Sequence, residues 1–196
     1  MSKMKIDVYS IIKPEVEKLK TLGFKTASLD CRLLLSQILE KAYPVYTHEQ
    51  INISKNEIIN FQTLVKQRQK GKPVSRILNK RNFWKREYML NEDTLDPRPD
   101  SEILIEAVLE YFPNKTQLLK ILDLGSGTGC LGLSLLEEYE DSLISFADAS
   151  KKSLEIVKKS SHQFWRKGKL KCVHLDWHTY NWDTQLLNFE ENKKYD

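Results

Sequence analysis

The sequence has 196 residues, with 31 basic and 27 acidic side chains, a net charge of +4 and 40% apolar residues. This length accommodates one large or two small domains, and the apolar fraction suffices for a hydrophobic core. The charge is too evenly balanced to argue for a nucleic-acid partner and indicates a solvated surface of mixed charge, and no stretch is long and apolar enough to span a bilayer. Three widely spaced cysteines form neither a disulfide framework nor a zinc pattern: Cys31, Cys130 and Cys172. Because the N-terminus also lacks an apolar signal region, we expect a cytoplasmic protein.

Residues 1–71 are expected to form a helical N-terminal domain. Apolar side chains recur at helical spacing over residues 8–22, where Pro14 marks an interruption or a late start. Ser28 is expected to cap a second helix. The sequence Ser54-Lys55-Asn56-Glu57 is a capping box that predicts the start of a third helix. Three amphipathic helices of this kind predict a small bundle that serves packing or partner docking.

Residues 72–100 have a different character and are predicted to form a β-hairpin linker. Three β-prone segments occur here, Ile77-Leu78, Phe83-Trp84 and Tyr88-Met89-Leu90. In Asp96-Pro97-Arg98-Pro99 each proline pushes the preceding residue into extended backbone, so this stretch cannot be helical.

Residues 101–196 are predicted to belong to the α/β class, with a parallel, doubly wound sheet. Asp100 or Ser101 is expected to cap a first helix that runs to Tyr111, after which strands alternate with helices. The expected strands are 118–124, which is apolar on both faces and therefore expected to be buried, 143–147 and 170–175. Ser150 is expected to cap the helix before the third strand. Ligands of such sheets bind at the carboxyl ends of the strands, where three carboxylates stand: Asp123, Asp148 and Asp176.

A glycine-rich loop follows the first of these strands and precedes a helix over residues 131–139. Glycine lets the backbone approach a ligand closely, and the free N–H groups of a helix start favour negative charge. Two ligand classes fit the loop. Gly127-x-Gly129-x-x-Gly132 with Asp148 downstream matches the dinucleotide fingerprint, whereas Asp123 before the first glycine resembles the first motif of Rossmann-like S-adenosylmethionine-dependent methyltransferases. A carboxylate suits the ammonium and sulfonium of that donor and suits a pyrophosphate badly, so the methyl donor is favoured.

The order of motifs resembles that of the HemK-type methyltransferases, which methylate a glutamine side-chain amide of class I peptide chain release factors. Members of this family have a helical N-terminal domain, a short β linker and a Rossmann-like catalytic domain. The linker is the most specific part of the likeness, through these segments: Gly71-Lys72-Pro73, Ile77, Phe83-Trp84, Asn91-Glu92-Asp93 and Pro97-Arg98-Pro99-Asp100-Ser101-Glu102. The resemblance covers essentially the whole chain and implies that residues 101–196 are the first half of a Rossmann-like methyltransferase domain.

The resemblance also implies S-adenosylmethionine as cofactor and assigns residues to its site. Asp148 would accept hydrogen bonds from the ribose hydroxyls, and Asp176 and Trp177 would lie beside the adenine, where an aromatic face can stack. The methionine part of the donor would be held by Asp123 and the loop residues Gly125, Ser126, Gly127, Thr128 and Gly129. Trp84 and Trp165 are expected to pack in the core, and no metal role is expected for His174 and His178.

The chain departs from the family pattern at three linker positions. Lys85 and Asn79 stand where the family often has glycine, and asparagine is the residue that best tolerates positive φ. Asp96 takes a place that is usually apolar. These departures suggest relaxed constraint and leave the donor site intact.

The family's acceptor loop, Asn-Pro-Pro-Tyr, follows a fourth strand that opens with a sequence like Lys-Tyr-Asp, and the present sequence ends at Lys194-Tyr195-Asp196. An amide nitrogen is a poor nucleophile, and the resemblance implies that this loop aims its lone pair at the donor methyl. We therefore expect a truncated chain that binds the donor but is inactive or weak in methyl transfer. The strand 119–124 would then lie at the sheet edge, so we also expect aggregation or self-association through that edge.

The leading interpretation is a release-factor glutamine methyltransferase whose partner is a class I release factor, with no direct contact to nucleic acid or membrane. Three alternatives stay open at this point. The chain could be an inert donor-binding or docking module, or a methyltransferase of ribosomal-protein glutamine or nucleic-acid adenine. A dehydrogenase is the remaining alternative, which Asp123 disfavours. No catalytic residue and no metal ligand is assigned.

Overall fold

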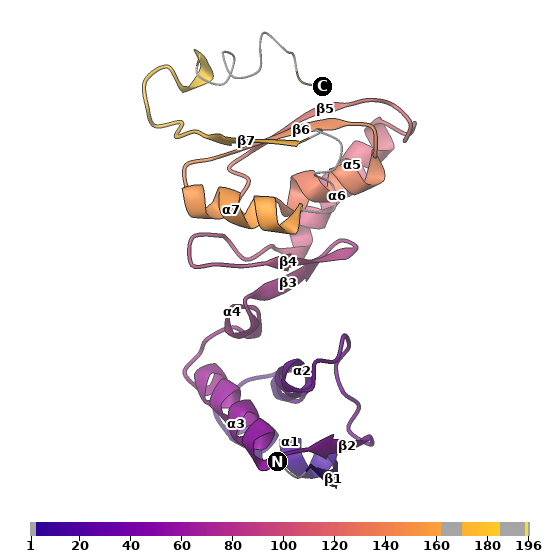
Figure 1. Cartoon of the computed structure of the whole chain (residues 1–196), viewed down its shortest axis with the longest axis vertical. Helices are drawn as coiled ribbons and strands as arrows, with labels where there is room; N and C mark the ends of the chain where they lie inside the picture. Colours follow the sequence, from indigo (N-terminus) through magenta and orange to yellow (C-terminus); the bar gives the residue numbers. More distant parts are fainter. Residues whose placement is uncertain (1–2, 162–169, 185–194, 196) are drawn as a thin grey trace. The chain divides into compact units, whose positions relative to one another are not determined.

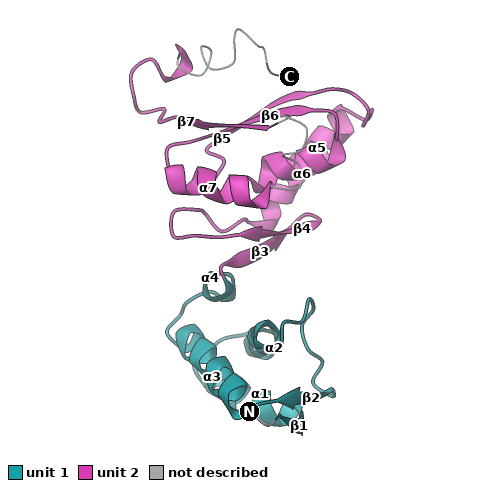
Figure 2. Cartoon of the chain, in the orientation of Figure 1, with its two compact units in different colours: residues 1–78 teal, residues 79–196 magenta. Residues whose placement is uncertain are grey.

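The computed structural model describes residues 3–161, 170–184 and 195. The chain divides into two compact units, residues 1–78 and 79–196 (Figure 2). The expected domain boundaries at residues 71 and 100 stay a prediction. In the described part of the chain, no helix combines the length and apolar character needed to cross a bilayer.

The first unit contains the predicted helices α1 (Val8–Thr21), α2 (Ala27–Ile38) and α3 (Lys55–Gln69). Helix α1 passes through Pro14 without a break. The Ser54–Glu57 capping box is present as expected, with the Ser54 hydroxyl accepting from Glu57 N at 3.2 Å and Glu57 Oε2 accepting from Ser54 N at 2.7 Å. The apolar faces of the three helices meet in one core around Leu19, Leu34 and Phe61, which are fully buried.

Three expectations for this part of the chain were wrong. Strand β1 (Met4–Asp7) pairs antiparallel with β2 (Gln50–Ile53), so the unit is not all-helical; β2 is too short for its alternating burial to stand out in the sequence. Helix α2 begins at Ala27, with Thr26 at its N-cap position, so Ser28 lies inside the helix. Ile77-Leu78 belongs to a short helix, α4 (Val74–Leu78), and not to a β segment. The Pro73 carbonyl accepts from two amides of α4, and proline's fixed φ suits a helix start.

The second unit begins with the predicted hairpin of β3 (Lys80–Phe83) and β4 (Arg86–Met89). Asn79 has φ +54°, as its tolerance of positive φ predicted. At the hairpin turn the positive φ falls on Trp84, at +53°, and not on Lys85. Glu102 Oε1 accepts from Trp84 N at 2.8 Å, and Glu138 accepts from Trp84 Nε1 at 2.9 Å, so two carboxylates hold this turn.

The basic residues of the hairpin each meet a carboxylate, so this charge run is structural. The ion pairs are Lys80–Glu87 at 3.1 Å, Arg81–Asp96 at 3.7 Å, Arg86–Glu137 at 3.8 Å, and Lys85–Glu138. Lys115 also pairs with Glu138, whose side chain is 4% exposed. The hairpin is thereby attached to the helix that carries Glu137 and Glu138.

The predicted parallel sheet and α/β class are confirmed. Its strands are β5 (Lys120–Leu124), β6 (Leu143–Asp148) and β7 (Leu170–His174), in the order β5-β6-β7. The connecting helices are α6 (Cys130–Glu138) and α7 (Lys151–Ser160), and Ser150 caps α7 as predicted. Helix α5 (Glu102–Tyr111) precedes the sheet and follows a 3-10 turn, η1 (Pro99–Ser101), and Ser101 makes no side-chain cap bond.

Helices α5, α6 and α7 lie on one side of the sheet (Figure 1). There Phe146 of β6 packs with apolar residues of all three helices and of the hairpin, including Ile105, Leu133, Val157 and Tyr88. The opposite face carries only a small cluster around Ala147, Val173 and Leu175 in the described residues.

Strand β5 is less buried than its double-sided apolar pattern predicted. Within the described residues it pairs with β6 alone, so it lies at an edge of the sheet, as expected. Its first four residues are half-buried and Leu124 is 40% exposed, and Leu118, two residues before the strand, is 54% exposed. In the described part of the chain, the apolar residues of this strand are therefore less covered than a strand buried on both faces would be.

Candidate functional site

The glycine-rich loop connects β5 to α6 and folds back onto the end of β6. Gly125 N and Ser126 N both donate to the Ala147 carbonyl, at 2.8 and 3.1 Å, and Gly129 N donates to the Ser126 carbonyl at 2.7 Å. The φ angles of Gly125, Gly127 and Gly129 are +74°, +52° and +74°. Side chains rarely adopt this conformation, so the loop requires glycine at these positions.

The space around each glycine differs. A Cβ on Gly127 would meet nothing closer than 4.0 Å, so the backbone here is open to a ligand. A Cβ on Gly132 would lie 2.4 Å from Ile144 Cδ1 and 2.5 Å from Phe146 Cε1. The third glycine of the dinucleotide fingerprint is therefore explained by close packing of α6 on β6, and only Gly127 offers an open approach.

Asp123 lies beneath the first turn of α6, where its Oδ2 accepts from Gly132 N at 3.0 Å. Burial raises the pKa of Asp123 to about 6, against the lowering effect of the Gly132 N–H, and the charge of Asp148 raises it further. The group is thus ionised at neutral pH at an energetic cost. The influence of Asp148 reflects how close the two strand ends bring the carboxylates.

Asp148 ends β6 and is held on both sides by backbone N–H groups. Its Oδ2 accepts from Gly127 N and its Oδ1 accepts from Ser150 N, both at 2.8 Å. A carboxylate has about four lone-pair sites, so both oxygens can still accept from a ligand hydroxyl. The structure therefore presents a carboxylate of set orientation beside the open backbone of Gly127.

Trp177 follows β7 and borders the same loop. A Cβ on Gly125 would lie 2.9 Å from Trp177 Cη2, so the indole edge lies against the loop, and the side chain is 43% exposed. The neighbouring Asp176 serves a local turn, with Oδ1 accepting from His178 N at 2.9 Å and its carbonyl accepting from Thr179 N at 3.0 Å. Of this predicted pair, Trp177 is the member that the structure brings to the loop.

One part of the site was missed by sequence reasoning. The turn of residues 91–94 precedes Leu95, whose backbone N would lie 4.0 Å from a Cβ on Gly127. Asn91 Oδ1 accepts from Asp93 N and Thr94 N, and Asn91 Nδ2 donates to the Lys152 carbonyl at the start of α7. Asparagine, aspartate and threonine in close succession favour such a turn, which was the available signal. Of the tryptophans expected in the core, Trp84 packs there in part, and Trp165 lies outside the described residues.

The residues present fit a nucleoside ligand with a positively charged side group. Gly127 leaves an open approach, Asp148 has spare acceptor capacity for hydroxyls, and Trp177 presents a partly exposed aromatic ring. The buried hydroxyl of Ser126 has no hydrogen-bond partner among the described residues. Two neighbouring carboxylates, Asp123 and Asp148, favour a cation and disfavour a pyrophosphate.

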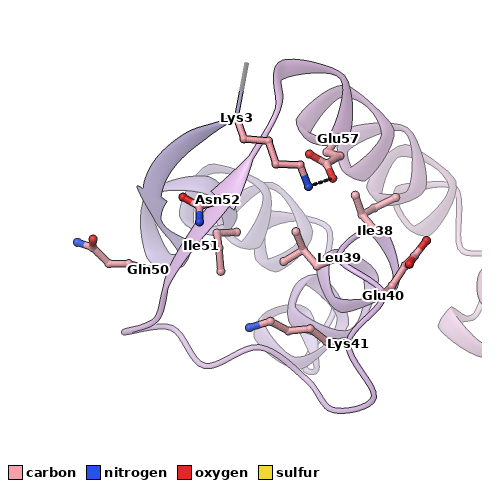
Figure 3. A pocket seen from close by; sticks show the side chains of 9 residues that line it. All are labelled: Lys3, Ile38, Leu39, Glu40, Lys41, Gln50, Ile51, Asn52 and Glu57. Carbon is pink, nitrogen blue, oxygen red and sulfur yellow. Dashed lines mark hydrogen bonds and ion pairs between the residues drawn. The ribbon is translucent and has the colours of Figure 1, made fainter. Parts of the chain in front are cut away.

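A separate cavity of about 460 Å³ lies in the first unit (Figure 3). Its floor includes Ile38, Leu39 and Ile51. Lys3 on its wall pairs with Glu57 at 3.1 Å, and Lys41 pairs with Glu49. Three of its four charged lining residues are thus paired, and the fourth, Glu40, is exposed. The lining residues include no glycine and no aromatic ring, so the cavity differs in chemistry from the glycine loop.

Comparison with known proteins gives two family matches. The PrmC N-terminal domain matches residues 16–78, and the methyltransferase small domain matches residues 82–184. A release factor glutamine methyltransferase of Shewanella oneidensis is 38% identical over 68% of this chain and 46% of its own length. A release factor glutamine methyltransferase of Leptospira interrogans is 31% identical over 80% of this chain and 55% of its own length. A bifunctional methyltransferase of Rickettsia bellii is 28% identical over 89% of this chain and 36% of its own length.

The chain spans about half or less of the length of these curated relatives, between 36% and 55%. Among solved structures, coclaurine N-methyltransferase bound to N-methylheliamine and S-adenosylhomocysteine matches at 19% identity and a TM-score of 0.35. That match covers 88% of this chain and 50% of the other. This likeness is too weak to assign residues.

Proposed function

Since the chain belongs to the methyltransferase small domain family and carries a PrmC N-terminal domain before it, we propose that its glycine loop binds S-adenosylmethionine for glutamine methylation. The predicted membership of the HemK type is confirmed by these two matches. We propose that the acceptor is a glutamine side-chain amide of a class I peptide chain release factor. The names of the relatives from Shewanella oneidensis and Leptospira interrogans support this acceptor.

The observation that carries the proposal is the convergence of Asp123, Gly127, Asp148 and Trp177 at the carboxyl ends of β5, β6 and β7. Gly127 would admit the methionine part of the donor along its open backbone. Asp148 would accept from the ribose hydroxyls, since both its oxygens keep free lone pairs. Trp177 would stack beside the adenine, and Asp176 would support it through the turn that it closes.

When bound, the donor supplies an electrophilic methyl group, and the residues of this chain bind and orient it. Asp123, ionised above about pH 6, would stabilise the donor's positive charges from beneath the loop. The amide-binding motif Asn-Pro-Pro-Tyr does not occur in these 196 residues. We therefore propose that a polypeptide of residues 1–196 binds the donor and transfers no detectable methyl group to a release factor.

Titration calorimetry tests the donor site. S-adenosylhomocysteine should bind and NAD should not, and Gly127→Val should abolish binding because it adds a side chain where φ is +52° and fills the open approach. Asp148→Ala should weaken binding by about 1.5–3 kcal/mol, since it removes a charged acceptor from two hydroxyls. Glu155→Ala, which removes an exposed carboxylate from α7, is the matched control and should leave affinity unchanged. Tight NAD binding, or full affinity in Asp148→Ala, would contradict the proposal.

The alternatives share this donor site and differ in the acceptor. An inert donor-binding module would bind S-adenosylhomocysteine, and addition of the C-terminal half of a longer relative would not produce methyl transfer. Assays of the reconstituted protein with a release factor, a ribosomal protein and adenine-containing nucleic acid would separate the remaining specificities. We expect methyl transfer to the release factor alone.

A further inference from the structure

The turn of residues 91–94 is closed by its own side chains. Asn91 Oδ1 accepts from Asp93 N at 3.1 Å and from Thr94 N at 2.9 Å. The Thr94 hydroxyl in turn accepts from Asn91 N at 3.0 Å, and Thr94 is buried. The side-chain oxygen of Asn91 thus shapes the turn, and its side-chain NH2 group can donate to another element.

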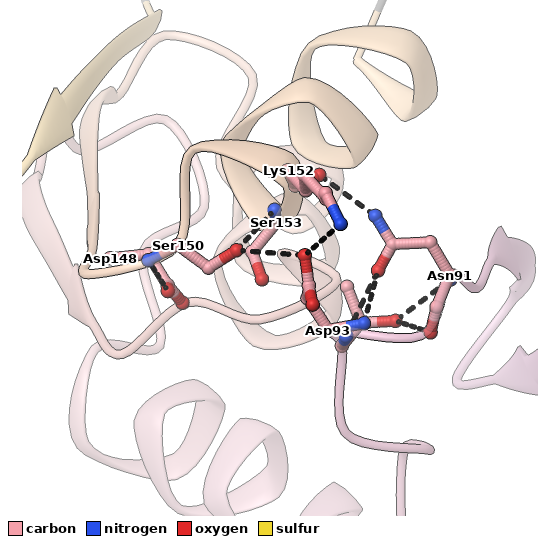
Figure 4. A network of polar contacts seen from close by, with 7 residues as sticks. Asn91, Asp93, Asp148, Ser150, Lys152 and Ser153 are labelled. Carbon is pink, nitrogen blue, oxygen red and sulfur yellow. Dashed lines mark hydrogen bonds and ion pairs between the residues drawn. The ribbon is translucent and has the colours of Figure 1, made fainter.

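That second element is the N-terminus of α7 (Figure 4). Asn91 Nδ2 donates to the Lys152 carbonyl at 2.9 Å. Asp93 Oδ2 accepts from the Ser150 hydroxyl at 3.3 Å and lies 3.6 Å from Lys152 Nζ. One turn of the linker therefore contacts both the capping residue of α7 and its first helical turn.

Ser150 connects this contact to Asp148. The Ser150 hydroxyl accepts from Ser153 N at 3.2 Å, which fixes the start of α7, and Ser150 N donates to Asp148 Oδ1 at 2.8 Å. The other oxygen of Asp148 accepts from Gly127 N, and the backbone of Leu95, directly after the turn, lies beside Gly127. Both amides that orient Asp148 thus belong to segments that border the linker turn.

We propose that Asn91 is a positioning residue for the donor site. By fixing the start of α7, it keeps Ser150 N in place to hold Asp148 in the orientation that accepts ligand hydroxyls. This inference rests on the proposed function in one respect: it takes the ribose hydroxyls as the groups that donate hydrogen bonds to Asp148. A purely structural role would attach the linker to α7 without any effect on how Asp148 meets its ligand. The two roles differ in what the loss of Asn91 does to recognition of the ribose hydroxyls.

The experiment uses the whole chain with Asn91→Ala, Asn91→Asp and the control Glu92→Ala, which changes an exposed neighbour in the same turn. Asn91→Asp keeps the oxygen that shapes the turn and loses the donor to the Lys152 carbonyl, so it separates the two uses of the side chain. The first readout is hydrogen exchange of the Ser150 and Gly127 amides without ligand. The second is the calorimetric affinity for S-adenosylhomocysteine and for its 2′,3′-dideoxy analogue.

The original chain and Glu92→Ala should bind S-adenosylhomocysteine about tenfold or more tightly than the dideoxy analogue, because hydrogen bonds to a charged acceptor contribute about this much to affinity. Both Asn91 variants should reduce this preference to about twofold or less, leave affinity for the dideoxy analogue unchanged, and speed exchange of both amides about tenfold. A preserved preference, or an equal loss for both ligands, would overturn the positioning role, as would unchanged amide exchange. If the original chain bound neither ligand, the proposed function would fail, and the exchange rates would still decide whether Asn91 orients Asp148.

Discussion

Replacing Asp123 with asparagine separates the cost of burying this carboxylate from its use in binding. Burial raises its pKa from 3.8 to about 6, a difference of about two pH units. Each unit corresponds to about 1.4 kcal/mol, so ionised Asp123 lowers the free energy of unfolding by about 3 kcal/mol. Because the folded pKa lies above the unfolded one, this loss is absent below about pH 4 and grows as the pH rises towards 6. Asparagine keeps an oxygen for Gly132 N, which Asp123 Oδ2 contacts at 3.0 Å. We therefore expect Asp123→Asn to raise the free energy of unfolding by about 2–3 kcal/mol at pH 7.5 and by little at pH 4.

Denaturant unfolding of the original chain and of Asp123→Asn at the two pH values measures this difference. In calorimetry the variant should bind S-adenosylmethionine more weakly than the original chain, since it lacks the negative charge that stabilises the donor's cationic groups. The original chain should also lose donor affinity as the pH falls below about 6, and the variant should not. Equal unfolding free energies at pH 7.5 would refute the burial cost. Full donor affinity in the variant would refute the role of Asp123 beneath the loop.

Three further substitutions test packing, charge pairing and the sheet edge. Gly132→Ala places a methyl group 2.4 Å from Ile144 Cδ1, so the free energy of unfolding should fall by about 1–3 kcal/mol; unchanged stability would contradict the close packing of α6. Burial acts to raise the pKa of Glu138, but hydrogen bonds from Lys115, Lys85 and Trp84 lower it to about 2, so its stabilising effect is lost as the pH falls from 4.5 towards 2. In thermal melts Glu138→Gln should therefore be less stable at pH 7 by about 1–3 kcal/mol, with a difference that narrows in acid. Leu118→Lys should reduce self-association of residues 1–196 in sedimentation, whereas Leu22→Lys, at a similarly exposed position of the first unit, should not. A chain that is monomeric before any substitution would contradict association through the edge of β5.

Local signals account for the features that the sequence predicted well. The capping box at Ser54 and the cap at Ser150 each depend on groups within four residues of one another. The positive φ angles of Gly127 and Asn79 likewise follow from the conformational freedom of the residue itself. Alternation of strands and helices predicted the parallel sheet, because a parallel crossover needs a long connection.

The expectation for Ile77 was wrong because its intrinsic β preference did not decide its conformation. Ile77 is β-prone, yet it lies in a helix that Pro73 begins, and its side chain is buried in the core of the first unit. The positive φ of Trp84 at the hairpin turn had no signal in the sequence; Glu102 and Glu138, far along the chain, bind its backbone and indole N–H groups. Such contacts leave no periodicity in the sequence.

In the candidate site, too, some features follow from local sequence and others from tertiary contacts. The sequence by itself determined the glycine loop and the carboxylates at the strand ends, because backbone freedom and strand position are local properties. Only the tertiary structure decided three contacts. Asp123 accepts a hydrogen bond from Gly132 N, Trp177 rather than Asp176 borders the loop, and the Asn91 side chain reaches the start of α7. Those contacts join residues that are far apart in the chain or on different elements, and their geometry exists only once the strands and helices have packed.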